Sequence, residues 1–474
     1  MADRPGDDVP LPAPAVVPAN LPANLPVVDV RDHGAVGDGV TNDHPAVVRA
    51  LYDEFTPTER SVRRVPRPGT ARGYVLYFPP GRYRIDGLLD RMFVHDNITI
   101  RGAGRGVTTL AFDQHDGQVP HGRPWHLDGR SRLAIGGKRD RPLVGVTIEH
   151  LTLTTDPFPF EGSDRRLGAT VLTVGWSTDV RVTDVEVCGV PSFGMYLYHC
   201  RGVTVEDCHV HHTHVDGIHV SRSERVTVRG CRVHDTGDDA ISISGTAEQP
   251  GADIEVVSNT VHRSGSNGIS VFGVSNVRIT DNAVHDTYQA GIGIRPYPGH
   301  GDTTDVVIAD NRIDGAGLYP VAGRPPEAPL WGGGSPCGIA VANDSGGWPD
   351  DPAYVDVAIT GVVVRSNRVE RCRDTFVAIR RAAGVTVVGN TFTGPLLHGA
   401  RDHDGGERGA HDGGSGVFAQ PAPYDTHDLP AGPEGPTPPA IRCRDSADVR
   451  IEDNTITVPA GRRAVLIERG EHLP

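Results

Sequence analysis

The chain has 474 residues, a formal net charge of −14, and a composition rich in glycine (59) and proline (39) but poor in aromatic residues (5%). A strongly acidic chain is a poor partner for a nucleic-acid backbone or an anionic lipid surface, so we expect neither nucleic acid nor membrane as a partner. Many turn-forming residues with few aromatics favour short strands joined by tight turns over a helical bundle.

The start of the chain indicates an arm without a targeting signal. Residues 1–26 are rich in Pro, Ala and Asn, which predicts a flexible N-terminal arm. The first residues lack a basic and an apolar segment of the secretory type, and no apolar run is long enough to cross a bilayer. We therefore expect a cytoplasmic protein, or a secreted one whose signal is absent from this sequence. The seven cysteines form no CxxC pair, which predicts neither a disulfide framework nor a zinc site.

A helix is predicted directly after the first short strand. The segment Thr41–Asp43 can cap it, and Pro45 suits its first turn. Its apolar face is formed by four periodic positions: Val47, Val48, Leu51 and Phe55. We expect this helix to cap the open N-terminal end of a repetitive β structure, whose unpaired edge would otherwise aggregate. The coils are then predicted to begin with Tyr74–Ile85.

This opening carries the sequences GAVGDGVTND and FPPGRY. Both resemble the start of proteins of the pectate-lyase-like superfamily. The resemblance implies the fold, and polymer-cleaving enzymes and phage tailspikes share it.

Internal repeats define the fold class. Segments of similar pattern follow one another with steps of 23 residues or slightly more, and they begin at Val203, Val226, Ile254, Val277 and Val306. Each has two alternating apolar stretches around a polar corner and is too short to bury its own core, so the coils must stack. We predict an all-β fold, a right-handed parallel β-helix with an N-terminal capping helix. Residues 27–474 are predicted to form one such domain.

Two columns of residues recur at corners of these repeats. The first predicts an asparagine ladder, in which amides bond from coil to coil and asparagine tolerates left-handed backbone angles; its members are Cys208, Cys231, Asn259, Asn282, Asn311, Asn367, Asn390 and Asn454. The second is a column of histidines, His211, His234, His262 and His285. We expect these rings to stack at about 4.8 Å and to bind no metal.

Three aspartates lie on two consecutive repeats. Asp216 and Asp239 occupy the same position of neighbouring repeats, and Asp238 directly precedes Asp239. Because neighbouring coils are about 4.8 Å apart, the three carboxyl groups are predicted to converge. Such like charges raise at least one pKa and leave a protonated acid beside an ionised base, which glycosidic bond cleavage requires. The alternative is structural: a Gly-Asp-Asp turn at Asp238 and a corner cap at Asp216.

Residues 215–243, VDGIHVSRSERVTVRGCRVHDTGDDAISI, resemble the active-site stretch of the polygalacturonase family of glycoside hydrolases. The resemblance implies Asp238 as the general acid, with Asp216 and Asp239 activating water for inversion. Other β-helical glycosidases, acting on dextran or α-1,3-glucan, resemble this arrangement. The carboxyl spacing itself leaves inversion and retention open.

Three departures from the family pattern change the expected substrate. His214 and Val215 replace Asn-Thr, Ser266–Gly268 replace Gly-His-Gly, and Arg295–Tyr297 replace Arg-Ile-Lys. The missing lysine would grip a uronate, so a neutral or unusual glycan is expected, and His219 is the candidate for the missing histidine. The residues predicted to contact this carbohydrate are His214, His219, Asn267, Arg295, Tyr297 and Trp331.

Two interruptions are predicted as insertions, at residues 320–356 and 394–440. Long loops in a compact repeat protein are often functional, and Trp331 in the first could stack on a sugar ring. Surface decoration is the alternative for the second insertion.

Other functions remain open. A polysaccharide lyase or uronate C5-epimerase needs a base and a charge neutraliser, for which Arg295, Tyr297 and Arg380 are candidates. No cofactor is predicted for a hydrolase, whereas a lyase could hold calcium in the acidic patch. A non-catalytic glycan-binding β-helix is the third alternative. The sequence does not predict the oligomeric state.

Overall fold

The computed structural model describes residues 25–57, 62–66, 72–87, 89–90, 93, 95–113, 132–156, 170–295, 300–319, 336–342, 357–396, 439–458 and 463–468. The predicted arm, Tyr297 and Trp331 lie outside these residues. Helix is limited, in the described part of the chain, to the 3-10 helix η1 (Val30–His33) and the α-helix α1 (His44–Leu51). No described helix has the length and apolar character needed to cross a membrane.

Helix α1 forms where it was predicted. The Asn42 side chain accepts a hydrogen bond from the backbone N–H of His44 at 3.0 Å. Asp43 instead accepts bonds from the backbone N–H groups of the preceding loop, at 2.7 and 3.1 Å. The apolar positions Val47, Val48 and Leu51 are buried. That α1 caps the end of the coils stays a prediction.

The predicted extension of this helix to Phe55 is wrong. The chain leaves α1 at Tyr52 and enters strand β3 (Tyr52–Pro57), which pairs antiparallel with β4 (Val62–Pro66). Four consecutive residues of β3, from Tyr52 to Phe55, include two aromatic side chains, which suit a strand better than a helix.

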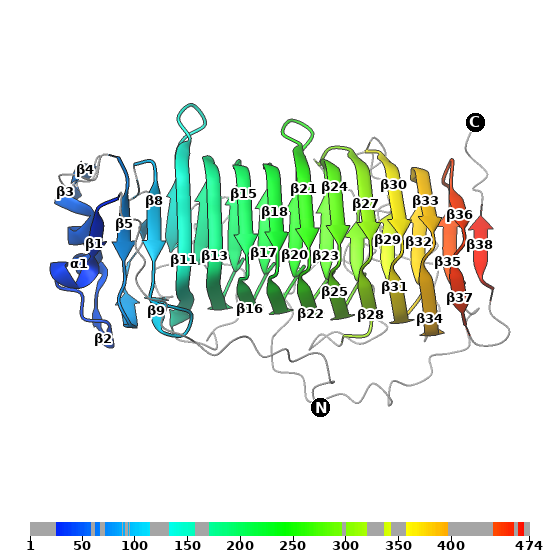
Figure 1. The fold of residues 1–474 in the computed structure, drawn as a ribbon, viewed down its shortest axis with the longest axis horizontal. Helices are drawn as coiled ribbons and strands as arrows, with labels where there is room; N and C mark the ends of the chain where they lie inside the picture. Colours follow the sequence, from blue (N-terminus) through cyan, green and yellow to red (C-terminus); the bar gives the residue numbers. More distant parts are fainter. Residues whose placement is uncertain are drawn as a thin grey trace, which may run out of the picture. The chain divides into compact units, whose positions relative to one another are not determined.

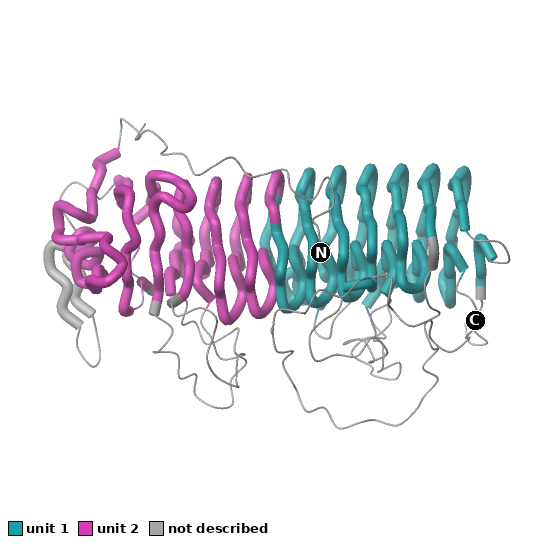
Figure 2. The backbone as a smooth tube through the Cα atoms, turned by 90° about the horizontal axis from the view of Figure 1, so that it is seen from below, with its two compact units in different colours: residues 1, 219–228, 233–474 teal, residues 2–218, 229–232 magenta. Residues whose placement is uncertain are grey.

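The chain forms two compact units (Figure 2). The first, called the N-terminal unit, comprises the described residues up to 218 together with 229–232. The second, the C-terminal unit, comprises residues 219–228 and the described residues from 233 onward. Each unit is built from three parallel ladders, and Figure 1 labels many of their strands.

The N-terminal unit contains the first coils. One ladder consists of β1 (Val27–Asp29), β5 (Tyr74–Tyr77), β8 (Ile98–Arg101), β11 (Leu143–Asp156), β13 (Ser177–Val190) and β15 (Arg201–Glu206). The next consists of β2 (Asp38–Asn42), β6 (Gly81–Ile85), β9 (Thr108–Asp113), the distal parts of β11 and β13, and β16 (His209–Thr213). The third consists of β7 (Leu89–Asp90), β10 (Leu133–Gly136), β12 (Leu172–Gly175) and β14 (Met195–Tyr198). Because β1 pairs with β5, the strands stack from Val27 onward, earlier than predicted.

The C-terminal unit repeats this plan. One ladder consists of β21 (Gly251–Val257), β24 (Val274–Thr280), β27 (Thr303–Ala309), β30 (Ile359–Arg365), β33 (Ala383–Val388) and β36 (Arg450–Glu452). The next consists of β22 (Thr260–Ser264), β25 (Ala283–Thr287), β28 (Arg312–Ala316), β31 (Arg368–Cys372), β34 (Thr391–Leu396) and β37 (Thr455–Thr457). The third consists of β20 (Ile241–Ser244), β23 (Ile269–Phe272), β26 (Ile292–Ile294), β29 (Ile339–Ala342), β32 (Val377–Arg380), β35 (Ile441–Arg444) and β38 (Val465–Glu468). The remaining strands are β17 (Ile218–Ser221), β18 (Glu224–Arg229) and β19 (Arg232–Thr236).

These ladders confirm the predicted all-β fold, a parallel β-helix. Each strand pairs with the equivalent strand of the next coil, and alternate side chains point inward. Val277 and Ile279 on β24 are fully buried, as is Val306 on the next coil. Burial of one such side chain contributes roughly 1.5–3 kcal/mol, so the aliphatic columns stabilise the stack.

The asparagine ladder is confirmed. In every consecutive pair one Nδ2 donates to the next Oδ1 at 2.9–3.0 Å, through Asn259, Asn282, Asn311, Asn367, Asn390 and Asn454. The left-handed angles lie elsewhere than expected, on the residue before each asparagine, as at Ser258 (φ 56°), Asp281 (57°) and Asp310 (59°). The asparagines therefore serve as hydrogen-bonding groups, while their neighbours make the bend.

The stacking of histidine rings is confirmed for three members of the predicted column. The ring of His262 lies 4.5 Å from that of His234 and 4.9 Å from that of His285, with interplanar angles of 15° and 3°. His211, in the N-terminal unit, instead packs at 4.3 Å against the ring of His209.

The predicted insertion at residues 320–356 needs correction, because it contains a strand of the ladder. β29 pairs with β26 on one side and β32 on the other. Residues 320–356 therefore include one strand of the β-helix, Ile339–Ala342, which is short and apolar. The predicted insertion at 394–440 begins within β34, and its residues 397–438 lie outside the described part.

Replacing Asn311 with alanine is expected to destabilise the C-terminal unit by roughly 3 kcal/mol, because it removes partners of buried backbone and amide groups. Asn311 accepts from the backbone and side-chain nitrogens of Asn282, and donates to the carbonyl of Ile279. The urea midpoint measures this loss. The control Glu255→Ala, at an exposed position of β21, is expected to change stability by less than about 0.5 kcal/mol. Equal effects of both variants would contradict a stabilising ladder.

Candidate active site

Asp239 is held in a defined orientation by the neighbouring coil. Its Oδ1 accepts hydrogen bonds from the backbone N–H of Asn267 at 2.9 Å and from the Asn267 side-chain amide at 2.8 Å. Its Oδ2 accepts from the Ser270 hydroxyl, which lies 3.1 Å from the Ser242 hydroxyl. Asp239 is buried, so its carboxylate is fixed by these donors before any ligand arrives.

Asp238 has a different environment from its neighbour. It is exposed, whereas Asp239 is only 8% exposed. The Thr236 hydroxyl donates to the backbone carbonyl of Asp238 at 2.9 Å, which shapes the turn that separates the two side chains. The Gly-Asp-Asp turn that was the alternative to a catalytic role is thus present. It involves the backbone of Asp238 and leaves the Asp238 side chain at the surface.

His219, on β17, lies close to this group. Its Nε2 is 3.0 Å from the hydroxyl of Ser244, which donates to Ser221 at 2.9 Å. Burial lowers the pKa of His219 to about 4, although the nearby Asp239 acts in the opposite direction. The imidazole is therefore neutral at pH 7 and can exchange hydrogen bonds without carrying charge.

Two predicted substrate contacts are used within the protein. Asn267 is 6% exposed, and its amide group is directed to Asp239. Arg295 is also 6% exposed and donates to the Gln289 side chain at 3.1 Å. Gly293 lies between them, since a Cβ there would come within 3.1 Å of the Asn267 Oδ1. Asn267 thus positions Asp239, and Arg295 packs beside it.

Asp216 and His214 belong to the N-terminal unit. Asp216 is 5% exposed, and its backbone carbonyl accepts from Gly194 at 3.0 Å. His214 is also buried, and its backbone N–H donates to Val190 at 2.9 Å. The alignment of Asp216 with Asp239 rests on the repeat pattern and stays a prediction.

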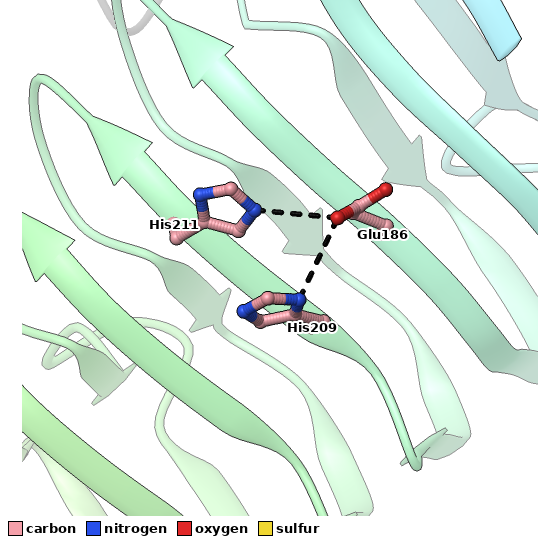
Figure 3. Close-up of side chains that lie close together, drawn as sticks. All are labelled: Glu186, His209 and His211. Atoms are coloured by element: carbon pink, nitrogen blue, oxygen red, sulfur yellow. Dashed lines mark hydrogen bonds and ion pairs between the residues drawn. The ribbon is translucent and has the colours of Figure 1, made fainter. Parts of the chain in front are cut away.

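Sequence reasoning missed a second group of titratable side chains, in the N-terminal unit: Glu186, His209 and His211 (Figure 3). Hydrogen bonds from His209 and then His211 hold the pKa of Glu186 far below its usual range, and burial lowers the pKa of His209. The signal was present: two histidines two residues apart share one face of a strand, and Glu186 is one repeat length before His209.

A surface hollow of about 230 Å³ lies over the strands β18, β21 and β24. Arg225, Asp253, Glu255 and Arg278 are among its lining residues. It shares no strand with Asp239, which lies two residues before the start of β20, so we do not assign the candidate chemistry to it.

Two family descriptions match the chain. The one described as "Right handed beta helix region" matches residues 177–347, and "Rhamnogalacturonase A/epimerase, pectate lyase-like" matches residues 27–244. Each match covers less than half of the chain, and both agree with the three parallel ladders on a right-handed β-helix that is similar to the pectate-lyase-like superfamily.

The individual proteins that are similar to this chain have several different activities. The mannuronan C5-epimerase AlgE3 of Azotobacter vinelandii is 27% identical over 125 residues, which are 24% of this chain and only 6% of that protein. Three solved structures share the fold. The Agl-KA catalytic domain has a TM-score of 0.56, 16% identity and coverage of 95% of this chain and 69% of that one.

The other two structures are the adhesin PfbA of Streptococcus pneumoniae and the Family 28 exopolygalacturonase of Yersinia enterocolitica. PfbA has a TM-score of 0.56 at 12% identity and covers 94% of this chain and 100% of its own. The exopolygalacturonase has a TM-score of 0.51 at 15% identity and covers 80% and 76%. At these identities the likeness shows the fold alone.

Protein stability is expected to depend on the titration of His219. Its folded pKa of about 4 is below the value of about 6.5 in an unfolded chain, so the unfolded state binds more protons between these pH values. Stability therefore falls as the pH falls through this window, by on the order of 2 kcal/mol between pH 7.5 and 5.0. Urea midpoints at both pH values measure it. His219→Gln is expected to lose less over the same interval, and an identical loss in both proteins would contradict the assignment.

Proposed function

We propose that the protein is a carbohydrate-active enzyme, an inverting glycoside hydrolase acting on a neutral or unusual glycan. Asp238 is the proposed general acid, and Asp216 and Asp239 are the proposed bases that activate water. The observation that carries this proposal is the contrast between two adjacent carboxyl groups: Asp239 is buried and oriented by three donors, while Asp238 is exposed.

This contrast suits a reaction that needs two carboxyl groups in different roles. The exposed Asp238 can approach a glycosidic oxygen and deliver a proton to it. The oriented Asp239 keeps lone pairs that can accept a proton from water, because its three donors occupy only part of its accepting capacity. Asp216 occupies the same position of the preceding repeat in the sequence, which is why it is proposed as the second base.

The environment of Arg295 supports a substrate without a carboxylate. Its guanidinium donates to Gln289 and is only 6% exposed. The lysine that would follow it in the polygalacturonase pattern is absent, since Tyr297 stands at that position. A neutral glycan makes no demand for a cationic partner at this place.

Asp238→Asn is expected to lower hydrolysis of a responsive glycan by about 10²- to 10⁴-fold, the usual contribution of a positioned acid or base. Asp239→Asn is expected to lose activity to a similar extent. A panel of soluble neutral and acidic glycans, read by reducing-sugar release and by ¹H NMR of the first-formed anomer, identifies the substrate and the stereochemistry.

The matched control is Asp253→Asn, which changes an exposed aspartate of β21 and should keep full activity. Full activity of both Asp238→Asn and Asp239→Asn would exclude the three-aspartate site. Release of product with retained configuration would exclude the inverting assignment.

A polysaccharide lyase or uronate C5-epimerase is the second candidate, and the sequence match to AlgE3 favours it. It would use a base and a charge neutraliser drawn from Arg295, Tyr297 and Arg380, with calcium as a possible neutralising ion. Incubation with a polyuronate in D₂O distinguishes it: an epimerase incorporates deuterium at C5, and a lyase produces the absorbance of an unsaturated uronate. Loss of either signal on calcium chelation would assign the ion.

The third candidate is a non-catalytic glycan-binding protein. It predicts that the protein binds a glycan without forming any product, and that Asp238→Asn has no effect on the affinity.

A further inference from the structure

Glu186, His209 and His211 converge on the outer side of two neighbouring coils in the N-terminal unit (Figure 3). Glu186 is on β13, and the two histidines are on β16. Glu186 is the ladder partner of His209, and His211 follows two residues later on the same face of its strand. Strand pairing therefore fixes all three backbones, and their side chains are directed toward one another.

The distances between the polar atoms fit the edges of a metal coordination polyhedron. The Oε1 of Glu186 lies 3.6 Å from the Nδ1 of His209 and 3.4 Å from the Nε2 of His211. A zinc ion with nitrogen and oxygen ligands at 2.0–2.2 Å in a tetrahedron requires ligand atoms about 3.3–3.6 Å apart. One atom from each residue lies within 4.8 Å of the others. An ion can thus occupy the space between them with small side-chain rotations.

Further hydrogen bonds, made by the other polar atoms of these side chains, orient the atoms that would coordinate the ion. The Thr152 hydroxyl donates to the Oε2 of Glu186 at 2.7 Å and so directs Oε1 toward the histidines. The Nδ1 of His211 lies 2.7 Å from the Nδ1 of His212, which leaves Nε2 on the side of Glu186. Such outer partners fix the tautomer and direction of metal ligands in proteins.

Exposure and donor type indicate which ion would bind. The side chains of His209, His211 and Glu186 are 15%, 17% and 24% exposed, so an ion can enter from solvent and keep one open position. Two imidazoles with one carboxylate suit divalent transition metals, whereas Ca²⁺ and Mg²⁺ prefer oxygen ligands.

We propose that Glu186, His209 and His211 bind one divalent transition-metal ion, with Zn²⁺ as the fitting ion. The ion joins β13 to β16 and thereby links two consecutive coils outside the core. This site is independent of the proposed glycan chemistry, because none of its residues belongs to the three-aspartate group.

Isothermal titration of the chelator-treated full chain with ZnCl₂ tests the site. The wild type is expected to bind one Zn²⁺ per chain with a raised thermal midpoint, and Ca²⁺ is expected not to compete with Zn²⁺ for this site. Glu186→Gln and His211→Asn are each expected to abolish this binding and the shift. Thr152→Val removes the outer hydrogen bond to Glu186, together with the acceptor of the Gly106 backbone N–H, and is expected to weaken binding about 10- to 100-fold. His285→Asn is the matched control, because His285 is a half-buried histidine on β25 and should bind as the wild type does.

Two results would overturn the proposal. One is the absence of Zn²⁺ binding to the wild type up to millimolar concentration. The other is binding that Glu186→Gln and His211→Asn leave unchanged. X-ray absorption of the Zn²⁺-loaded wild type gives an answer that does not depend on the folding of variants: two imidazole ligands support the site, and sulfur or only oxygen ligands overturn it.

Discussion

The hydrogen bonds between equivalent residues of neighbouring coils are the constraint on which this structure depends. A single coil is too small to exclude water from its interior, so its side chains are stabilised only when the next coil covers them. The backbone ladders provide that stacking, and the asparagines add a side-chain bond at one corner in each step from Asn259 to Asn454. Because every coil is held to the next in a fixed register, a residue type repeated at one position becomes a physical column.

The candidate site follows from this constraint and from one local turn. The register brings Asn267 and Ser270 beside Asp239, and these two residues orient a carboxylate that would otherwise face several directions. The turn at Asp238 then separates two successive aspartates into an interior and an exterior environment. A repetitive scaffold with aliphatic columns thus supports a polar group in which one aspartate is buried and its neighbour is exposed.

Much of the fold could be predicted from the sequence, because its signals are periodic. The column of asparagines and three members of the histidine column follow from spacing alone. Phe55 was assigned to the helix because it continues the helical period, but the pairing of β3 with β4 overrode that period. The strand β29 was hidden because it is four residues long between long glycine- and proline-rich segments.

The roles of individual side chains were harder to predict, because the sequence gives the position of a residue but not its partner. Asn267 and Arg295 were predicted to contact the carbohydrate, yet their polar groups are directed to Asp239 and Gln289. The group of Glu186, His209 and His211 escaped notice for the same reason, since it joins two strands whose contact depends on the register. Hydrogen-bond partners across coils require coordinates.

The ladder tolerates large differences in the length of chain between its members. Asn311 and Asn367 are 56 residues apart in sequence, and their side chains form a 2.9 Å bond, close to the 3.0 Å of Asn367 and Asn390, which are separated by 23 residues. Vertical spacing and loop length are therefore independent variables in this architecture. Evolution can lengthen, shorten or replace the segments at a corner without moving the residues above and below it, so new surfaces for ligands can arise while the polar group on the neighbouring face keeps its geometry.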